Sequence, residues 1–458
     1  MPRNDGKMKT MKKLFKQFYT NLFLENRLFI ALGTCSALFL FAFFLPILGD
    51  IPYISFSVLV ALLLIDVYLL HAAKKTVFLR RDVPERLSNG DDNELKIYLE
   101  NFYPFPISVG IIDEIPFQFQ KRNLWFNASL KPKEQKIISY LLRPTKRGEY
   151  EFGFTRLFVK SPLGLVSRRF NVEGTGMVPV YPSFLKLREY ELMAISNRLV
   201  DVGIKKVRRV GNSMEFDQVK SYVAGDDIRT INWKATARRA DFMVNSYIEE
   251  RSQHIYCVID KSRAMKMPFE EMSLLDYAIN ASLILSRVAL LKQDKAGLIT
   301  IAEKTKNVVL ADRRPTQLNK IMEVLYKEKT RYLETDMEAL FVSLRSALKQ
   351  RSLVVFFTNF ESMSALERQL PYLKRIAKYH LLLVVFFENT TLKSLSDNDA
   401  KDVEGVYIKT IAEKFAYEKR LMVKALTKHG ILSLLTAPQN LTVNVVNRYL
   451  AIKARQQI

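Results

Sequence analysis

Cysteine and histidine are scarce in this sequence. The chain of 458 residues contains two cysteines and four histidines. Cys35 lies in an apolar run and Cys257 in a predicted strand, and neither belongs to a Cys-x-x-Cys or His-x-x-x-His pattern. Disulfide frameworks and zinc hydrolase sites are built on such pairs, so the sequence argues against both and fits a reducing compartment.

A glycine-rich nucleotide loop is also missing. The first strand of the predicted α/β region, residues 255–260, continues into Lys-Ser-Arg-Ala-Met, which offers no glycine backbone to surround a phosphate group. This argues against an NAD or ATP site.

Acidic residues are outnumbered as well. The 47 Asp and Glu residues face 70 Lys and Arg, which gives a net charge of +23. The chain therefore favours an anionic neighbour, such as a lipid surface, a nucleic acid or an acidic partner protein.

Two long apolar runs lie near the N-terminus. Residues 28–48 and 54–73 are each long enough to cross the hydrocarbon core of a bilayer as a helix. The length of the first run, the absence of a small-residue cleavage site and the second run directly behind it argue against a signal peptide. We therefore expect two transmembrane helices, with a lipid bilayer as one partner.

Lys and Arg flank the pair of runs but are absent from the short link between them. These cations are Arg3, Lys7, Lys9, Lys12, Lys13, Lys16, Lys74, Lys75, Arg80 and Arg81. By the positive-inside rule, we expect both termini to lie in the cytoplasm. One acidic residue, Asp66, interrupts the second run, where a charge at the helix centre costs roughly 2.5–3.5 kcal/mol on insertion scales. We expect Asp66 to face the partner helix or to lie near the interface, and the alternative is a proton or ion role.

The hydrophobic pattern divides the chain into four regions of an α/β protein. Residues 1–75 hold the basic tail and the two apolar runs. Residues 76–182 contain short alternating strands broken by turns, which predicts an antiparallel β domain, either a sandwich or a barrel. We interpret residues 183–250 as a charged connector. Residues 251–458 alternate apolar strands with amphipathic helices, which predicts a doubly wound, mostly parallel sheet.

The connector contains the most distinctive stretch, GNSMEFDQVKSYVAGDDIRTINWKATAR. Its ordered Tyr, Gly-Asp-Asp, Arg, Ile, Trp and Ala-Arg resemble the hallmark of the bacterial domain-of-unknown-function fifty-eight family (DUF58). The matching positions are Tyr222, Gly225, Asp226, Asp227, Arg229, Ile231, Trp233, Ala237 and Arg238. Residues 78–101 and 147–170 and the two apolar runs match this family too, so the resemblance covers nearly the whole chain. Ala224 and Ser161 depart from it, at positions where Pro and Asp are common.

The Gly-Asp-Asp stretch joins an acidic turn to arginines and an indole. We expect Asp226 and Asp227 to cap a helical turn and to pair with Arg229 or Arg238, while Trp233 packs against a neighbouring segment. This predicts a latch between domains that docks a partner. The alternative is a hydrolase in which Asp226 and Asp227, together with Asp260, act as acid, base or metal ligands. Adjacent carboxylates diverge, and no nucleophile accompanies them, which disfavours that alternative.

The end of the first α/β strand is similar to the von Willebrand factor A domain, which the resembled family also carries. In such domains three loops bind a divalent ion, and the resemblance assigns its ligands to five positions of this chain. These positions are Asp260, Ser262, Ala264, Thr335 and Asn359. We expect a degenerate metal-ion-dependent adhesion site, because two of these positions have lost their usual oxygen or charge.

Ala264 offers no side-chain oxygen, Asn359 replaces a carboxylate by an amide, and Lys261 and Arg263 add positive charge. At most a weak Mg²⁺ or Mn²⁺ site remains. The alternative is that hydrogen bonds hold Asp260 and keep the shape of the loop without a metal.

The resemblance implies a protein-interaction module at the bacterial inner membrane. It further implies a partnership with a MoxR-like AAA+ ATPase in a chaperone-like or envelope-linked role. No catalytic residue or small-molecule substrate is evident, so we expect no enzyme. A further hypothesis is a membrane-tethered nucleic-acid binder that uses residues 204–211 and the net charge, against which stands the lack of a recognised reading motif.

Overall fold

A computed structural model describes most of the chain, which divides into two compact units. The first unit is Met1–Ser88, Asp92–Pro144 and Gly148–Val180, and the second is Asn89–Asp91, Thr145–Arg147 and Tyr181–Ile458. The described residues are 20–45, 47, 49–73, 75–120, 124–172, 174, 176–188, 215–224, 226–239, 241–248, 252–270, 272–303, 305–330, 333–397 and 402–455. The basic tail before residue 20, much of the predicted connector, Lys74 and Gly225 lie outside them.

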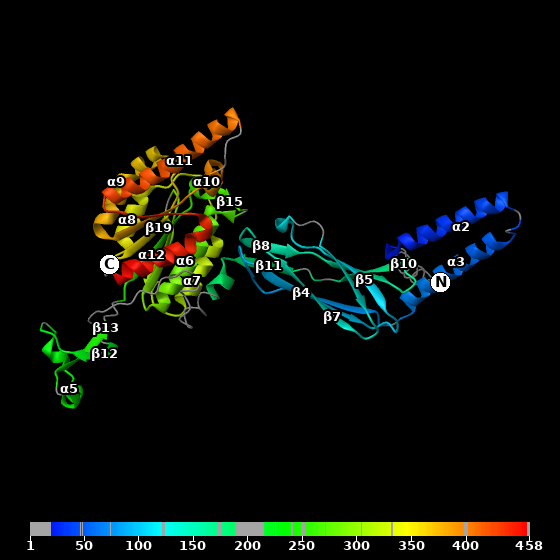
Figure 1. The fold of residues 1–458 in the computed structure, drawn as a ribbon, viewed down its shortest axis with the longest axis horizontal. Helices are drawn as coiled ribbons and strands as arrows, with labels where there is room; N and C mark the ends of the chain where they lie inside the picture. Colours follow the sequence, from blue (N-terminus) through cyan, green and yellow to red (C-terminus); the bar gives the residue numbers. More distant parts are fainter. Residues whose placement is uncertain are drawn as a thin grey trace, which may run out of the picture. The chain divides into compact units, whose positions relative to one another are not determined.

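Two apolar helices begin the first unit. Helix α2 spans Asn26–Phe44 and α3 spans Ile51–Ala72, and the two lie side by side (Figure 1). Only 11% of the most apolar stretch of α2 and 17% of that of α3 is buried. An apolar helix with this much exposed surface suits a hydrocarbon environment, since its backbone groups are satisfied internally. The prediction of two long apolar helices is confirmed.

An antiparallel β domain makes up the rest of the first unit. In β4 every second side chain is buried, and Leu95, Ile97 and Leu99 share one core with Val109 of β5 and Val159 of β9. The sheet orders are β1-β10-β9-β5-β6, β2-β4-β7 and β3-β11-β8. The elements are β1 Leu22–Leu24, β2 Val77–Asp82, β3 Leu87–Ser88, β4 Asn93–Asn101, β5 Ile107–Asp113, η2 Phe117–Phe119, β6 Trp125–Leu130, β7 Gln135–Leu142, β8 Gly148–Phe152, β9 Thr155–Lys160, β10 Val166–Val172 and β11 Gly176–Tyr181. The predicted antiparallel β region is confirmed.

Asp66 of α3 binds the β domain rather than helix α2. Its side chain is fully buried, and the Ser161 hydroxyl donates a hydrogen bond to its Oδ1 atom. The backbone N–H groups of Leu165 and Val166 donate to Oδ2 at 2.9 and 3.0 Å. Asp66 therefore does not face the partner helix, which was one of its two expected positions, and its place near the membrane interface stays a prediction. The carboxylate fixes α3 to the loop between β9 and β10.

The end of α3 is held at a second point. Its Leu70 carbonyl accepts hydrogen bonds from Arg168 Nη1 at 2.7 Å and from the Tyr103 hydroxyl at 3.0 Å. Lys160 also pairs with Glu25, the residue before α2, at 2.6 Å. Both helices thus leave the β domain from fixed points.

The second unit contains a mostly parallel sheet with the strand order β18-β17-β14-β19-β20-β21. Only the edge strand β18 runs antiparallel, against β17. Because parallel strands are buried on both faces, they are continuous apolar runs, as in β19 with Leu-Val-Val-Phe-Phe. The predicted mostly parallel sheet is confirmed.

Helices cover both faces of this sheet. One core joins α6, α7 and α12 to one face, and a second core joins α8, α9 and α11 to the other. The elements are β14 His254–Asp260, η5 Arg263–Lys266, β15 Pro268–Phe269, β16 Met272–Ser273, α6 Leu274–Leu291, β17 Lys295–Ile301, β18 Thr305–Asp312, α7 Gln317–Lys327, α8 Met337–Ala347, β19 Leu353–Phe357, α9 Met363–Tyr379, β20 Leu381–Phe387, α10 Thr390–Asp397, α11 Val403–Lys428, β21 Leu432–Thr436, η6 Pro438–Asn440 and α12 Leu441–Ala454.

Helix α6 is the third helix that is long and apolar enough to span a membrane, but 72% of it is buried. Ala278, Ile279 and Leu283 lie in the core against the sheet. The apolar composition of α6 is therefore explained by its central position in the α/β domain.

The Gly-Asp-Asp stretch lies on a small antiparallel hairpin. Strand β12 spans Glu215–Ser221 and pairs with β13, Met243–Ile248. Between them lie the short helices η4, Ile228–Thr230, and α5, Trp233–Arg239.

Candidate functional site

The carboxyl edge of the parallel sheet brings together three loops that are far apart in the sequence. Strand β14 lies between β17 and β19 and ends at Asp260. The next residue, Lys261, donates its backbone N–H to the Ile301 carbonyl at the end of β17, at 2.8 Å. The strand end is thus fixed to its neighbour. Parallel strands meet at one edge, which explains why Thr358, directly after β19, lies beside Asp260. Thr335 lies in the loop before α8, which the Asp336 N–H joins to the Ala302 carbonyl after β17 at 3.0 Å.

The Asp260 side chain is almost fully buried, with 2% of its surface exposed. Its Oδ1 atom accepts hydrogen bonds from the Ser262 backbone N–H at 2.8 Å and from the Thr335 hydroxyl. Its Oδ2 atom accepts from the Thr358 hydroxyl at 2.7 Å. Burial raises the pKa of the Asp260 carboxyl, although these hydrogen bonds act in the opposite direction. Protein groups therefore occupy both oxygens.

Asn359 lies next to this cluster and contacts a cation that the sequence did not reveal. The ammonium group of Lys419, on α11, donates hydrogen bonds to Asn359 Oδ1 at 2.9 Å and to the Phe360 carbonyl at 2.5 Å. The Asn359 amide in turn lies 3.5 Å from the Ala264 carbonyl. Burial lowers the pKa of Lys419 to about 8, although the nearby Glu361 raises it. An ammonium group thus occupies the amide oxygen expected to face a metal.

This set of donors does not fit a hard divalent cation. Such an ion needs several free oxygen ligands, and carboxylates to balance its charge. Here Asp260 has both oxygens engaged, Ala264 has no side-chain oxygen, and Asn359 accepts from Lys419. Across the described residues, no group of three or more His, Cys, Asp or Glu side chains is placed to hold a metal.

Lys261 and Arg263 were expected to add positive charge near the site, and each of them pairs with a carboxylate. The Lys261 side chain is 1% exposed and pairs with Glu328 at 2.6 Å. Glu328 also accepts from Thr300 at 2.9 Å, and although burial raises its pKa, the hydrogen bond from Lys261 and its other polar contacts lower it overall. Arg263 is exposed and lies 3.3 Å from Glu334. Both charges are balanced locally.

A cavity of about 210 Å³ opens beside Asn359 and Lys419. Its lining is mainly apolar, from the segment after η5, the end of β20, and helices α10 and α11. The apolar members are Met267, Phe269, Leu274, Phe360, Phe387, Leu392, Phe415, Ala416 and Pro438, and Glu361, Glu388 and Asn389 complete the lining. An apolar hollow with few polar groups is the usual form of a binding site.

The Gly-Asp-Asp hairpin holds its carboxylates by short-range contacts. Asp226 pairs with Lys220 at 2.8 Å and accepts from the Val223 backbone N–H at 3.0 Å. The Lys220 hydrogen bond lowers the pKa of Asp226. Asp227 caps η4 by accepting from the Arg229 backbone N–H at 3.0 Å, which confirms the predicted cap. The ion pair forms with Lys220, however, and not with either predicted arginine.

Trp233 is 67% exposed, so the expectation that its indole is buried is wrong. Tyr222 packs edge-on against Phe242 on the hairpin itself, with ring centres 6.5 Å apart. Arg229 and Arg238 are exposed. The hairpin therefore presents an indole and two guanidinium groups on its surface, and the latch between domains stays a prediction.

Sequence reasoning missed Thr358 and Lys419. Thr358 directly follows β19 and precedes Asn359, and the resemblance that pointed to Asn359 assigned no role to Thr358. No sequence pattern marked Lys419 as a site residue, because it is one of many charged residues on α11 and lies 60 positions from Asn359.

Comparison with known proteins gives few names. The family model described as "Protein of unknown function DUF58" matches residues 218–405. The uncharacterized protein YeaD of Bacillus subtilis (strain 168) is 25% identical over 237 residues, which cover 49% of this chain and 55% of YeaD. The match therefore spans about half the length of that relative.

Two solved structures cover just under half of this chain and all of their own. The conserved hypothetical protein BatB from Bacteroides thetaiotaomicron covers 44% of this chain, at 14% identity and a TM-score of 0.31. An aerotolerance-related membrane protein from Bacteroides fragilis NCTC 9343 covers 45%, at 12% identity and a TM-score of 0.27. Such low scores support no inference about activity. The family match confirms the resemblance seen in the sequence over residues 218–405, where the chain is similar to the DUF58 family.

Proposed function

We propose that this chain is a membrane-anchored adaptor that binds a partner protein at the carboxyl edge of its α/β domain. The observation that carries this proposal is the apolar cavity beside a carboxylate whose oxygens are already saturated by protein groups. A reacting carboxylate needs access to its substrate, whereas Asp260 is buried and serves to shape a loop. The edge is therefore suited to binding.

Exposed apolar residues on α11 extend the lining of the cavity. Phe415, which lines it, is 44% exposed, and Tyr407 and Val403 nearer the start of α11 are 68% and 88% exposed. Contiguous apolar surface of this kind marks sites of protein association. The occupant we propose is an apolar segment of another protein, with Lys419 offering one hydrogen-bond donor at the base of the cavity.

The finer identity of the domain and partner belongs to the same proposal. The parallel sheet, and an Asp at the end of its first strand beside Thr335, support a von Willebrand factor A-like domain with a degenerate ion site. The family resemblance supports a MoxR-like AAA+ ATPase as the partner. Asp227 and Trp233 on the exposed hairpin supply a second docking surface.

Membrane anchoring by two spans, with both termini in the cytoplasm, completes the proposal. The exposed apolar surfaces of α2 and α3 support the spans, and the distribution of Lys and Arg supports the orientation. In inner-membrane vesicles oriented as in the cell, protease added outside should spare residues 76–458. Cleavage of that region from the periplasmic side would overturn the orientation.

A photo-crosslinking residue at position 415 tests the docking site. In cells that express the full chain, it should capture an AAA+ ATPase, identified by mass spectrometry. The matched control is the same residue at Leu310, which is 60% exposed on the edge strand β18. Equal capture from both positions, or no ATPase from position 415, would count against the proposed partner.

The hydrolase alternative has little support in the geometry. Asp260 is buried with both oxygens engaged, and Asp226 and Asp227 accept backbone hydrogen bonds on the hairpin. A turnover assay on ester and phosphoester substrates, with Asp226→Asn as the comparison, separates the two functions. Turnover that this substitution abolishes would favour the enzyme.

A further inference from the structure

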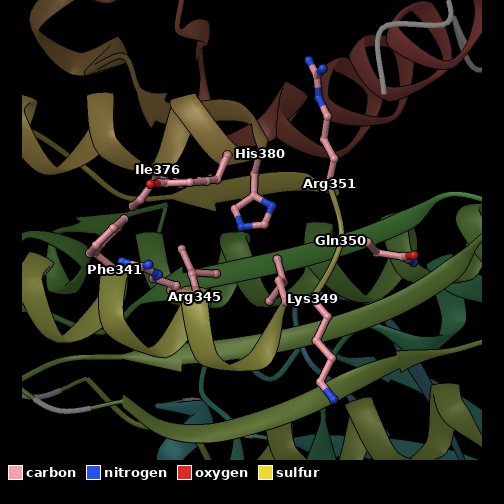
Figure 2. A pocket seen from close by; sticks show the side chains of 10 residues that line it. Phe341, Arg345, Lys349, Gln350, Arg351, Ile376 and His380 are labelled. Carbon is pink, nitrogen blue, oxygen red and sulfur yellow. The ribbon is translucent and has the colours of Figure 1, made fainter.

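A second cavity, also about 210 Å³, lies at the opposite edge of the parallel sheet. Its walls come from the end of α8, the end of α9 and the residues that lead into β19 (Figure 2). The lining residues are Phe341, Leu344, Arg345, Leu348, Lys349, Gln350, Arg351, Ile376, Tyr379 and His380. Its wall therefore combines apolar side chains with cations and includes no carboxylate.

His380 gives this cavity an unsatisfied polar atom. The residue is 7% exposed, and its Nδ1 atom is buried without a hydrogen-bond partner among the described residues. Its ring points into the centre of the cavity in Figure 2. Buried polar groups are normally paired, so an unpaired one in a cavity wall calls for a partner from outside the chain.

Three cations belong to the lining of this cavity, of which Arg345 lies in its wall. Arg345 approaches the face of the Tyr379 ring, 5.9 Å from its centre, and among the described residues it has no ion pair. Lys349 and Arg351 point away from His380 at the rim of the cavity (Figure 2). Gln350 is engaged elsewhere, because its side-chain nitrogen lies 2.7 Å from His254 Nε2.

The ends of α8 and α9 act against an anion here, because a helix C-terminus carries about half a negative charge. Cations in the last turn are a common answer to that charge, and Arg345 lies there. Three full positive charges nevertheless exceed two half charges of opposite sign. The surplus, together with the unpaired imidazole nitrogen, favours a bound anion.

The size and lining of the cavity restrict the anion further. A cavity of about 150 Å³ lined by apolar groups holds benzene. A cavity of 210 Å³ with Leu344, Leu348 and Ile376 in its wall therefore has room for one ring and a small charged group. We propose that this cavity binds a small aromatic carboxylate, with the ring against these aliphatic side chains and the carboxylate between Arg345 and His380.

Calorimetry with benzoate tests the proposal on the full chain in lipid nanodiscs, with empty nanodiscs titrated in parallel. Benzoate should bind more tightly than inorganic phosphate, which lacks the ring, and than benzyl alcohol, which lacks the charge. Arg345→Gln should weaken benzoate binding about tenfold, as expected for the loss of one charge-assisted hydrogen bond. Arg314→Gln is the matched control, because Arg314 is a surface arginine 77% exposed outside this cavity, and should leave binding unchanged.

His380→Gln supplies a second variant, and the histidine nitrogen spectrum supplies a readout that a structural role would not move. With four histidines in the chain, the signal lost in His380→Gln assigns His380. Benzoate should shift that signal in the unsubstituted chain and in Arg314→Gln. No benzoate binding at millimolar concentration, or equal binding by Arg345→Gln with an unshifted His380 signal, would overturn the proposal.

N-acetylphenylalanine separates two sources of this chemistry, since it carries the carboxylate of a chain end. Stronger binding of benzoate supports a free acid as the ligand. If N-acetylphenylalanine binds more strongly than benzoate, and N-acetylphenylalanine amide does not, the C-terminus of a peptide is supported as the ligand. Such a C-terminus would place the same ring and carboxylate in the cavity.

Discussion

Two buried aspartates, Asp66 in the unit with the two apolar helices and Asp260 in the α/β domain, each hold a loop in place but accept hydrogen bonds from different groups. Each side chain is at most 2% exposed, and each accepts three described hydrogen bonds. Asp66 accepts two of them from backbone N–H groups and one from a hydroxyl. Asp260 accepts one from the backbone and two from threonine hydroxyls.

The difference matters because a hydroxyl can rotate and can also accept a hydrogen bond, whereas a backbone N–H can only donate. At Asp66, Oδ2 faces two backbone donors, and the Ser161 hydroxyl at Oδ1 already accepts from the Leu163 and Gly164 N–H groups, so it is placed to donate. The partners of Asp260 can adapt to a neutral amide. The first carboxylate is a rigid joint between a helix and a β domain, and the second shapes a loop that tolerates change.

Substitution of Asp66 should have the largest effect. Asp66→Ala leaves the Leu165 and Val166 N–H groups without an acceptor, at about 1–3 kcal/mol for each buried donor. Asp66→Asn should also be harmful, because its amide nitrogen must face either these two N–H donors or the Ser161 oxygen, which already accepts two hydrogen bonds. Hydrogen exchange of residues 161–168, measured on the full chain in nanodiscs, should accelerate in both variants. Unchanged exchange in Asp66→Asn would remove the distinction between the two sites.

At Asp260, substitution by alanine should be more destabilising than substitution by asparagine. Asp260→Ala leaves Ser262 N–H without its acceptor and should destabilise the loop by about 1–3 kcal/mol. Asp260→Asn should have a smaller effect, because its amide oxygen can keep the hydrogen bonds from Ser262 N–H and Thr335 while the Thr358 hydroxyl accepts from its amide nitrogen. Hydrogen exchange of residues 258–264 measures both variants, and equal damage by the two would contradict the expected tolerance.

The raised pKa of Asp260 should make the difference in stability between the unsubstituted chain and Asp260→Asn depend on pH. A carboxyl with a raised folded-state pKa holds its proton more tightly in the folded chain. As pH rises above the unfolded value of about 3.9, the unsubstituted chain should therefore lose stability relative to Asp260→Asn. A constant difference between the two chains from pH 4 to 7 would show that Asp260 does not titrate in this range.

Deprotonation of Lys419, which lies in the α/β domain with Asp260, should have a smaller effect on the stability of that domain at alkaline pH. Its pKa is lowered to about 8 by burial, so between this value and about 10.4 the unfolded chain binds more protons. Stability should therefore rise with pH, by up to about 1.4 kcal/mol per unit, relative to Lys419→Met. Denaturant unfolding at pH 8 and 10 measures the difference. Parallel pH profiles of the two chains would place the titration elsewhere.

Removal of divalent metal should have no effect at either aspartate. Protein donors saturate both carboxylates, so EDTA or added Mg²⁺ should leave capture of the partner from position 415 unchanged. Calorimetry that shows micromolar Mg²⁺ or Mn²⁺ binding, lost in Asp260→Ala, would instead restore a working ion site.

The sequence predicted those parts of the structure that follow from strand patterns. Apolar runs located β14 and β19, whereas Thr335 beside Asp260 came from the resemblance to the von Willebrand factor A domain and not from a strand pattern. The partners of Asp66 could not be predicted, because Ser161 and Val166 lie about 100 positions away and contribute through a hydroxyl and a backbone N–H. Backbone donors leave no trace in residue identity.

Lys419 and Trp233 show two further limits of sequence reasoning. A lysine on a charged helix looks solvated, yet the fold places it against Asn359. An indole within a motif looks like a core residue, yet Trp233 is exposed on its hairpin. Both outcomes depend on what packs against the helix or the hairpin in the folded chain, and residue type alone does not specify that.

The apolar composition of α6 has a consequence for how the chain is synthesised. After the two N-terminal apolar helices the ribosome makes α6, which among the described helices also has the length and hydropathy for insertion. Arg287 lies within α6, four residues before its end, and an arginine inside a span opposes insertion, although less there than at the helix centre. We therefore expect Arg287 to oppose insertion of α6 before the sheet has formed to receive it. Arg287→Leu should raise the fraction of nascent chains in which α6 becomes inserted, which glycosylation mapping in microsomes would detect.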